Sequence, residues 1–142
     1  MLLVDVNVLV YAYREDSPDH IAFRSWLTEI LESGAPLGLA DLALSGFLRI
    51  TTHPDIFEPP SPLNHALRFV EALRAQPNCK ILTPGPRHWQ IFTQLCQATE
   101  AKGNFIPDAF FAAMAIEADA EWITADRRFK RFPGLKWRHP LR

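Results

Sequence analysis

Apolar runs separated by short polar stretches extend along the whole chain, and their lengths and periods predict its elements. Residues 1–12 are apolar almost throughout, with Asp5 and Asn7 as the polar exceptions. A continuous Leu/Val run of this kind is typical of a strand buried on both faces of a parallel sheet. Asp5 then lies where the strand ends, ahead of a short helix predicted over residues 8–13.

Further along, helical and strand patterns alternate. Apolar residues at helical spacing predict helices that begin near Ser17-Pro18, Asp41, Ser61-Pro62, Pro86 and Ala109. Short apolar runs predict strands over 36–39, 79–82 and 121–124, and a last strand around Lys136-Trp137. Strands separated by helices predict one domain over residues 1–142, a three-layer α/β/α fold with a mainly parallel central sheet.

The bulk composition is that of an ordinary globular protein. A chain of 142 residues with 48% hydrophobic residues is long and apolar enough for one core, which excludes a disordered chain. No run approaches the roughly 18 apolar residues that span a bilayer. No charged leader with a cleavage site precedes the first strand. We therefore expect a cytoplasmic protein without a membrane partner, with Cys79 and Cys96 as reduced packing residues.

Charge is distributed unevenly, although the net charge is only −1. Residues 1–126 hold all 16 acids and 8 of the bases, whereas residues 127–142 hold 7 bases and no acid. This basic tail has two interpretations. It is either a solvated segment that keeps the protein soluble or a patch that attracts phosphates beside an acidic site.

Three carboxylates are expected at one edge of the sheet. Asp5 follows the first strand, Asp126 follows the strand over 121–124, and Asp108 lies at the start of the helix before that strand. Right-handed crossovers bring the carboxyl ends of parallel strands to one edge, so Asp5 and Asp126 converge if their strands are neighbours. Taken singly, each has an ordinary alternative role, as a helix N-cap or a turn residue.

A cluster of these acids needs a cation. Two carboxylates about 4 Å apart repel by roughly 4 kcal/mol at an effective dielectric near 20. Oxygen ligands select Mg²⁺ or Mn²⁺, and these ions suit phosphoryl chemistry because they activate water and neutralise the phosphate. The five histidines show no metal-ligand spacing, and neither a glycine-rich phosphate loop nor a Gly-x-Ser-x-Gly elbow is present. The joint pattern favours a metal-dependent site.

Several motifs together resemble a known family. They are Leu3-Val4-Asp5-Val6-Asn7-Val8-Leu9, Gly103-Asn104-Phe105-Ile106-Pro107-Asp108-Ala109 and Thr124-Ala125-Asp126-Arg127-Arg128-Phe129. In order and spacing they resemble the PIN domain and, within it, the VapC toxins of type II toxin–antitoxin modules. Residues 46–51, 84–89 and 131–135 resemble the actinobacterial branch of that family, so the resemblance covers essentially the whole chain.

The resemblance implies a Mg²⁺-dependent endoribonuclease, usually a homodimer, that cleaves RNA by metal-activated water and is held silent by a VapB-like antitoxin. By position, Asp5 and Asp108 would be the metal ligands and Asp126 the third catalytic acid. Asn7 and Thr124 match polar positions that orient the acids or water. Nearby basic side chains would hold the RNA backbone, and the candidates from the tail are Arg127, Arg128, Lys130 and Arg131.

One position departs from the family pattern. Many relatives carry a glutamate in the helix before residues 46–51, and Leu44 is the expected equivalent here. Asp41, one turn earlier, either compensates for the missing acid or caps its helix. This departure suggests one alternative, a metal-poor PIN-like module that binds RNA. A second alternative, an RNA-processing PIN nuclease without an antitoxin, is decided by the neighbouring gene.

Overall fold

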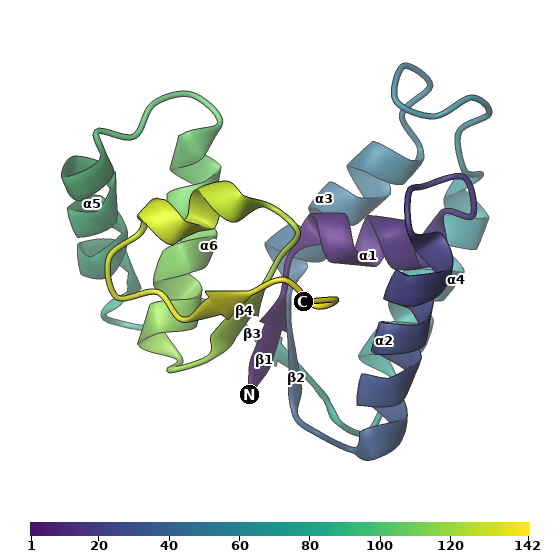
Figure 1. Cartoon of the computed structure of the whole chain (residues 1–142), viewed down its shortest axis with the longest axis horizontal. Helices are drawn as coiled ribbons and strands as arrows, with labels where there is room; N and C mark the ends of the chain where they lie inside the picture. The colour runs from purple at the N-terminus through teal and green to yellow at the C-terminus, as the bar shows by residue number, and fades with distance from the viewer.

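The computed structural model describes all residues from 1 to 142, and Figure 1 labels its strands and helices. The strands are β1 (Leu2–Val4), β2 (Leu37–Ala40), β3 (Cys79–Leu82), β4 (Glu121–Ile123) and β5 (Trp137–Arg138). The helices are α1 (Val6–Tyr13), α2 (His20–Ser33), α3 (Asp41–Thr51), α4 (Leu63–Arg74), α5 (His88–Thr99) and α6 (Phe105–Glu117), with a 3₁₀ helix, η1 (Arg127–Arg131).

The strands form one parallel sheet in the order β3-β2-β1-β4-β5. Helices α1 to α4 lie on one side of this sheet, and α5 and α6 lie on the other (Figure 1). The predicted three-layer α/β/α fold with a parallel sheet is therefore confirmed. β1 lies between β2 and β4, so the strand that carries Asp5 at its end is central.

The core consists of two apolar clusters, one on each face of the sheet. Alternate residues of a strand point to opposite faces, so adjacent strand residues belong to different clusters. Leu3 and Trp122 pack with α5 and α6, whereas Val4 and Ile123 pack with α1 to α4. All four side chains are fully buried. This double burial explains why β1 and β4 are apolar at consecutive positions.

Two helices begin earlier than the pattern predicts. Helix α1 begins at Val6, because the Asp5 side chain accepts a hydrogen bond from the Val6 N–H and caps the helix. Helix α6 begins at Phe105 instead of Ala109. Pro107 lies in its first turn, where a proline is tolerated because no hydrogen-bond donor is needed there. Asp108 is consequently part of the first turn and not the N-cap residue.

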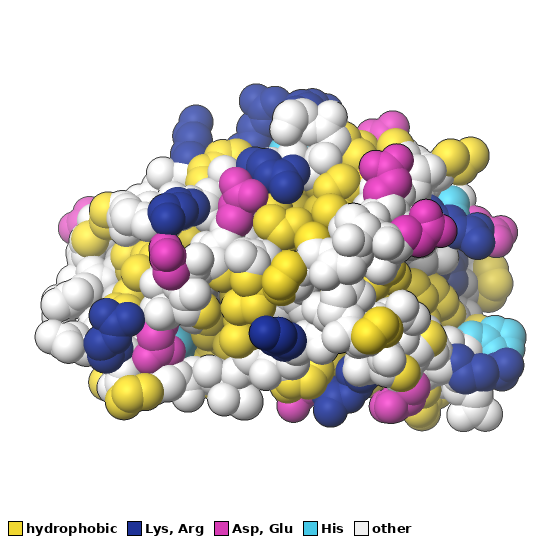
Figure 2. Space-filling view, turned by 90° about the horizontal axis from the view of Figure 1, so that it is seen from below, with side chains coloured by type: hydrophobic (Ala, Val, Ile, Leu, Met, Phe, Trp, Pro, Cys, Tyr) yellow, Lys and Arg dark blue, Asp and Glu magenta, His cyan; other side chains and the backbone are white.

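The basic tail is tied to the rest of the molecule. Lys136 pairs with Asp119 at 2.9 Å, and Arg138 pairs with Glu121 at 2.9 Å. Figure 2 views the molecule from the side of the amino ends of the strands, where dark blue basic side chains lie among magenta acidic ones. Part of the positive charge of residues 127–142 is therefore neutralised by acids of the body. No helix is long and apolar enough to cross a membrane.

Candidate active site

Asp5, Asp108 and Asp126 line one cavity of about 600 Å³ at the carboxyl edge of the sheet. β1 and β4 are hydrogen-bonded neighbours, with Val4 opposite Ile123, so the condition for Asp5 and Asp126 to meet is fulfilled. Asp108 reaches the same cavity from the first turn of α6. The structure therefore brings together the three acids that the sequence singles out.

The Asp5 carboxylate is held by a short hydrogen-bond network. Its Oδ1 accepts from the Val6 N–H at 2.7 Å, and its Oδ2 accepts from the Thr124 hydroxyl at 2.6 Å and from the Asn7 amide at 3.2 Å. The Thr124 oxygen in turn accepts from the Asp126 N–H at 3.0 Å. Asn7 and Thr124 thus connect the end of β1 with the loop that carries Asp126, and they orient Asp5 within the cavity.

The three carboxyl groups differ in their electrostatic surroundings. Burial raises the pKa of Asp5 to about 7, against the hydrogen bonds from Thr124 and Val6 and together with repulsion from the other two acids. Burial also raises the pKa of Asp108, although Arg128 opposes the shift. The hydrogen bonds from Arg128 lower the pKa of Asp126. The apo cavity therefore disfavours a full set of negative charges and favours a bound cation.

The raised pKa of Asp5 predicts a pH-dependent stability of the metal-free protein. Because the folded pKa is about 7 and the ordinary value is 3.8, the stabilising contribution is complete below pH 4 and is lost as pH rises through 7. In EDTA we expect the free energy of unfolding to fall by a few kcal/mol over that range. Asp5→Asn should flatten the decline. Urea unfolding of both proteins from pH 4 to pH 8 measures this, and equal slopes would contradict the prediction.

Arg128 lies over two of the acids. Its guanidinium donates to both Asp126 oxygens, with the Nη2–Oδ2 distance at 2.7 Å. The same Nη2 is 3.6 Å from Asp108 Oδ2, which is beyond hydrogen-bond distance. Asp126 also accepts from the Arg128 N–H and so caps η1. One arginine of the tail therefore lies in the acid cavity as a partial counter-ion.

The donor set of the cavity fits a divalent cation. Asp108 Oδ2 is buried and accepts no hydrogen bond, so one ligand oxygen is unsatisfied. No group of three or more His, Cys, Asp or Glu side chains is already arranged around a common metal position. Mg²⁺ is usually held in proteins by one or two carboxylates, with water and substrate phosphates completing its shell. Asp5 and Asp108 can supply those carboxylates.

Two residues of α3, Leu44 and Asp41, do not lie at the acids as the family resemblance suggests. Leu44 is buried in the core with Val4 and Phe47, at 4% exposure. Its position as the equivalent of the missing glutamate is therefore wrong, because its side chain points away from the cavity. Asp41 does not line the cavity either, and its exposed carboxylate pairs with Arg74 of α4. The structure does not bring Asp41 to the three acids.

A different face of α3, for which the sequence predicts no role, lines the cavity. This face carries Leu42, Ser45, Gly46, Arg49 and Ile50. A Cβ atom at Gly46 would lie 3.1 Å from Val6 Cγ2, so the glycine permits α3 to pack closely against the start of α1. The residues of this face follow Leu42 at spacings of three, four, seven and eight residues. This helical spacing distinguishes them in the sequence from the buried face of α3.

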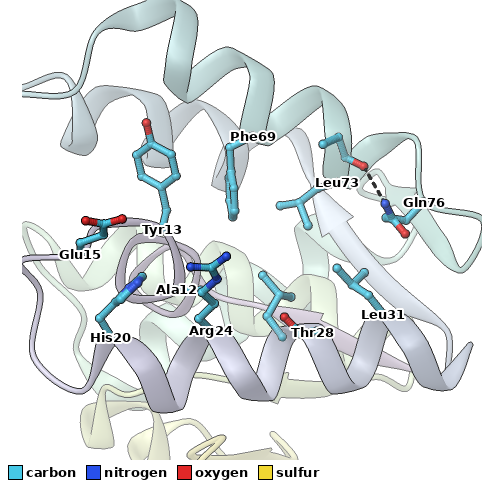
Figure 3. Close-up of a pocket in the computed structure, with 12 residues that line it drawn as sticks. Ala12, Tyr13, Glu15, His20, Arg24, Thr28, Leu31, Phe69, Leu73 and Gln76 are labelled. Atoms are coloured by element: carbon cyan, nitrogen blue, oxygen red, sulfur yellow. Dashed lines mark hydrogen bonds between the residues drawn. The ribbon is translucent and has the colours of Figure 1, made fainter.

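A second groove, of about 330 Å³, lies between α2 and α4. Figure 3 shows Arg24 and Thr28 of α2 facing Phe69 and Leu73 of α4, with Tyr13 at one end. None of the three clustered acids lines this groove. The cavity that contains Asp5 is therefore the candidate site for chemistry.

Comparison with known proteins agrees with this geometry. The PIN domain family model matches residues 2–135. The chain is 48% identical to ribonuclease VapC43 of Mycobacterium tuberculosis over 141 residues, 99% of this chain and 96% of the relative. This chain belongs to the PIN domain family, in its VapC branch. Ribonuclease VapC25 of the same organism is 41% identical over 99% of each chain.

Solved structures support the fold of this PIN domain. The VapBC2 complex from Rickettsia felis, bound to a DNA fragment from its promoter, contains a chain that matches with a TM-score of 0.72 at 17% identity, over 97% of each chain. VapBC-1 from nontypeable Haemophilus influenzae matches with the same TM-score of 0.72 at 14% identity, over 99% of this chain and 98% of the other. At these identities the likeness concerns the fold alone.

Proposed function

We propose that this PIN domain protein is a Mg²⁺-dependent endoribonuclease and the toxin of a type II toxin–antitoxin module. The observation that carries the proposal is the meeting of Asp5, Asp108 and Asp126 in one cavity at the carboxyl edge of the sheet. Relatives called VapC ribonucleases, 37–48% identical over at least 99% of this chain, support the choice of RNA as the substrate.

The residues around the cavity take separate roles in this proposal. Asp5 and Asp108 hold the cation, and Asp126 contributes through water. A bound Mg²⁺, or Mn²⁺ in its place, lowers the pKa of water and neutralises charge on the phosphate. Asn7 and Thr124 hold the Asp5 carboxylate in one orientation through their hydrogen bonds to Oδ2. A carboxylate held in this way needs little reorganisation when the RNA binds.

Basic residues of η1 are proposed to contact the RNA backbone. Arg127 and Lys130 are exposed there. Arg131 is partly engaged, since its guanidinium lies 4.4 Å from the Phe105 ring centroid and donates to the Thr99 carbonyl. Arg128 is ion-paired with Asp126, and we propose that it lies next to the reacting phosphate. Phosphate contacts of this kind position the strand without reading its sequence.

The activity itself is tested by digesting total RNA with the purified protein. We expect cuts at defined positions with Mg²⁺ or Mn²⁺ and none with EDTA, and sequencing of the new RNA ends locates them. Cleavage that continues in EDTA would contradict the metal-dependent assignment. RNA that is bound but left uncut with either metal would instead support the binding-module alternative.

An antitoxin is the proposed partner. The body of the chain over residues 1–126 is strongly acidic, and a basic side chain of a VapB-like tail can pair with the acids in place of the cation. We expect the product of the adjacent small gene to co-purify with this protein and to abolish its cleavage of RNA. Separate elution of the two products, with cleavage unchanged, would leave an RNA-processing nuclease without an antitoxin.

The homodimer implied by the family resemblance stays a prediction. Light scattering of the purified protein, alone and with the antitoxin, measures it directly. A monomer in both samples would remove the homodimer from the proposal while leaving the acid site as described.

A further inference from the structure

Besides the three acids, the same cavity is lined by apolar and aromatic side chains and by one exposed arginine, and we call this part of its lining the apolar half. This half lies between α3 and α6 and reaches α5. The side chains that define it are Arg49 and Ile50 from α3, Phe92 from α5, and Ile106 and Phe110 from α6. The four-residue spacing of Ile106 and Phe110 places both on one face of α6. The structure thus presents an apolar compartment continuous with the acid cluster.

Aromatic rings dominate one wall of this compartment. The Phe92 and Phe110 rings pack edge to face with centroids 5.6 Å apart, and Trp89 packs on Phe92 at 5.4 Å. Phe92 and Phe110 are half-buried, whereas Trp89 is 68% exposed. Phe110 is held in place by His88, whose ring lies 4.3 Å away and whose Nε2 is 2.9 Å from the Phe110 carbonyl. A rigid aromatic wall that stays partly accessible is suited to stacking a planar ligand.

Arg49 supplies positive charge on the opposite wall. It is exposed, lines the cavity and takes part in none of the ion pairs of the structure, which involve Arg14, Arg74, Arg128, Lys136 and Arg138. Arg128, the other arginine near the acids, is occupied by Asp126. The guanidinium of Arg49 is therefore available to an anionic ligand in this cavity.

We propose that this apolar half binds one unpaired nucleotide of the RNA next to the phosphodiester that is cut. Arg49 binds a phosphate of that nucleotide, and Phe92 and Phe110 hold its base. The inference rests on the proposed ribonuclease function. RNA fits better than a protein segment because these side chains line the same cavity as the acids and combine partly accessible aromatic rings with an arginine that makes no ion pair. A base inside a duplex is stacked and paired, so the subsite requires single-stranded RNA.

Binding measurements test the subsite without cleavage. The probe is a labelled single-stranded RNA that spans a cut made by the wild-type protein, and anisotropy is followed in EDTA. We expect Phe92→Ala to weaken binding by roughly 5- to 150-fold, the range given by loss of one stacked base, and Phe92→Tyr to restore it. Arg49→Ala should weaken binding and reduce the slope of log K against log salt by about 0.7, as expected for one phosphate contact to a single strand.

Matched controls come from α4, which contributes no residue to the lining of the acid cavity. Phe69→Ala removes a half-buried phenylalanine of the groove between α2 and α4, and Arg68→Ala removes an exposed arginine of α4. Both should leave the RNA affinity and its salt dependence unchanged. Losses equal to those of Phe92→Ala and Arg49→Ala would overturn the proposal, because they would mark the effects as general.

A single abasic nucleotide in the probe separates stacking from a structural role of Phe92. In the wild-type protein, the abasic change beside the cut should weaken binding about as much as Phe92→Ala does with the intact probe. In Phe92→Ala protein, the same abasic change should cost little more, because the stacking contact is already absent. Additive losses from the two changes would overturn the assignment of the base to this wall.

The outcomes distinguish this inference from the function on which it rests. If the wild-type protein cuts RNA but the Arg49 and Phe92 variants bind and cut it normally, the subsite is wrong and the nuclease stands. If the wild-type protein cuts no RNA, the proposed function fails and the inference falls with it. If the variants instead change the oligomeric state with RNA affinity intact, the apolar half is a contact between copies, and the proposal is overturned.

Discussion

Asp108→Asn and Asp5→Asn are each expected to slow RNA cleavage by more than about 100-fold at saturating Mg²⁺. Loss of an outer partner of a metal ligand already costs about 10- to 100-fold in metal affinity or activity, so loss of a ligand itself should cost more. Single-turnover cleavage of one mapped RNA measures the rate, and calorimetry with Mg²⁺ or Mn²⁺ measures binding. Both variants should also bind the cation more weakly.

Neither variant is expected to lose activity through unfolding. Burial raises the pKa of both carboxyl groups, so a neutral amide at either position is tolerated better than a carboxylate in the metal-free protein. We therefore expect a higher melting temperature in EDTA for Asp108→Asn. This is a common trade between stability and function at a site of clustered charges.

Asp41→Asn is the matched control for these substitutions. Its carboxylate is exposed, pairs with Arg74 and does not line the acid cavity. Cleavage and metal affinity should stay at wild-type values, with a stability loss of about 0.5–1 kcal/mol at most for the surface ion pair and helix end. If Asp41→Asn abolished metal binding while Asp108→Asn retained it, the site would be assigned to the wrong acids.

The sheet and the three acids could be predicted from the sequence because both depend on local signals. The doubly buried strands β1 and β4 are continuous apolar runs, and an acid directly after such a run is conspicuous. The start of α6 was predicted too late because Pro107 suggests a boundary, whereas the structure accepts it in the first turn. The sequence pattern does not predict the 3₁₀ helix η1. Its segment is short and mostly charged, and its start depends on one hydrogen bond from the Arg128 N–H to the Asp126 side chain.

The walls of the cavity were harder to predict. Phe92 and Phe110 occur in apolar stripes that are typical of a core, and only the packing of α5 against α6 leaves them accessible from the acid cavity. Arg49 is one of several arginines in the sequence. Only the structure shows that it lines the cavity and makes no ion pair. The basic tail is prominent in the sequence, yet three of its seven bases, Arg128, Lys136 and Arg138, are paired with nearby acids.

Leu44→Glu is expected to unfold the protein rather than to restore a missing metal ligand. Leu44 is 4% exposed and packs in the core with Val4 and Phe47. Losing a buried leucine costs about 2–5 kcal/mol, and an unpaired buried carboxylate adds several more. The sum approaches the total stability of a domain, which is roughly 5–15 kcal/mol. Thermal unfolding followed by circular dichroism should show little cooperative transition for this variant.

Ser45→Glu places the same side chain one residue further along α3, on the exposed face that lines the acid cavity. This variant should fold. A fourth acid on the wall of this cavity repels Asp5 and Asp108 in the metal-free protein and attracts a cation by the same electrostatics. Its melting temperature in EDTA should therefore fall, and Mg²⁺ should bind more tightly in calorimetry. The opposite result would be a folded Leu44→Glu protein that binds Mg²⁺ more tightly, together with an unchanged Ser45→Glu protein. It would mean that Leu44, and not Ser45, faces the acids.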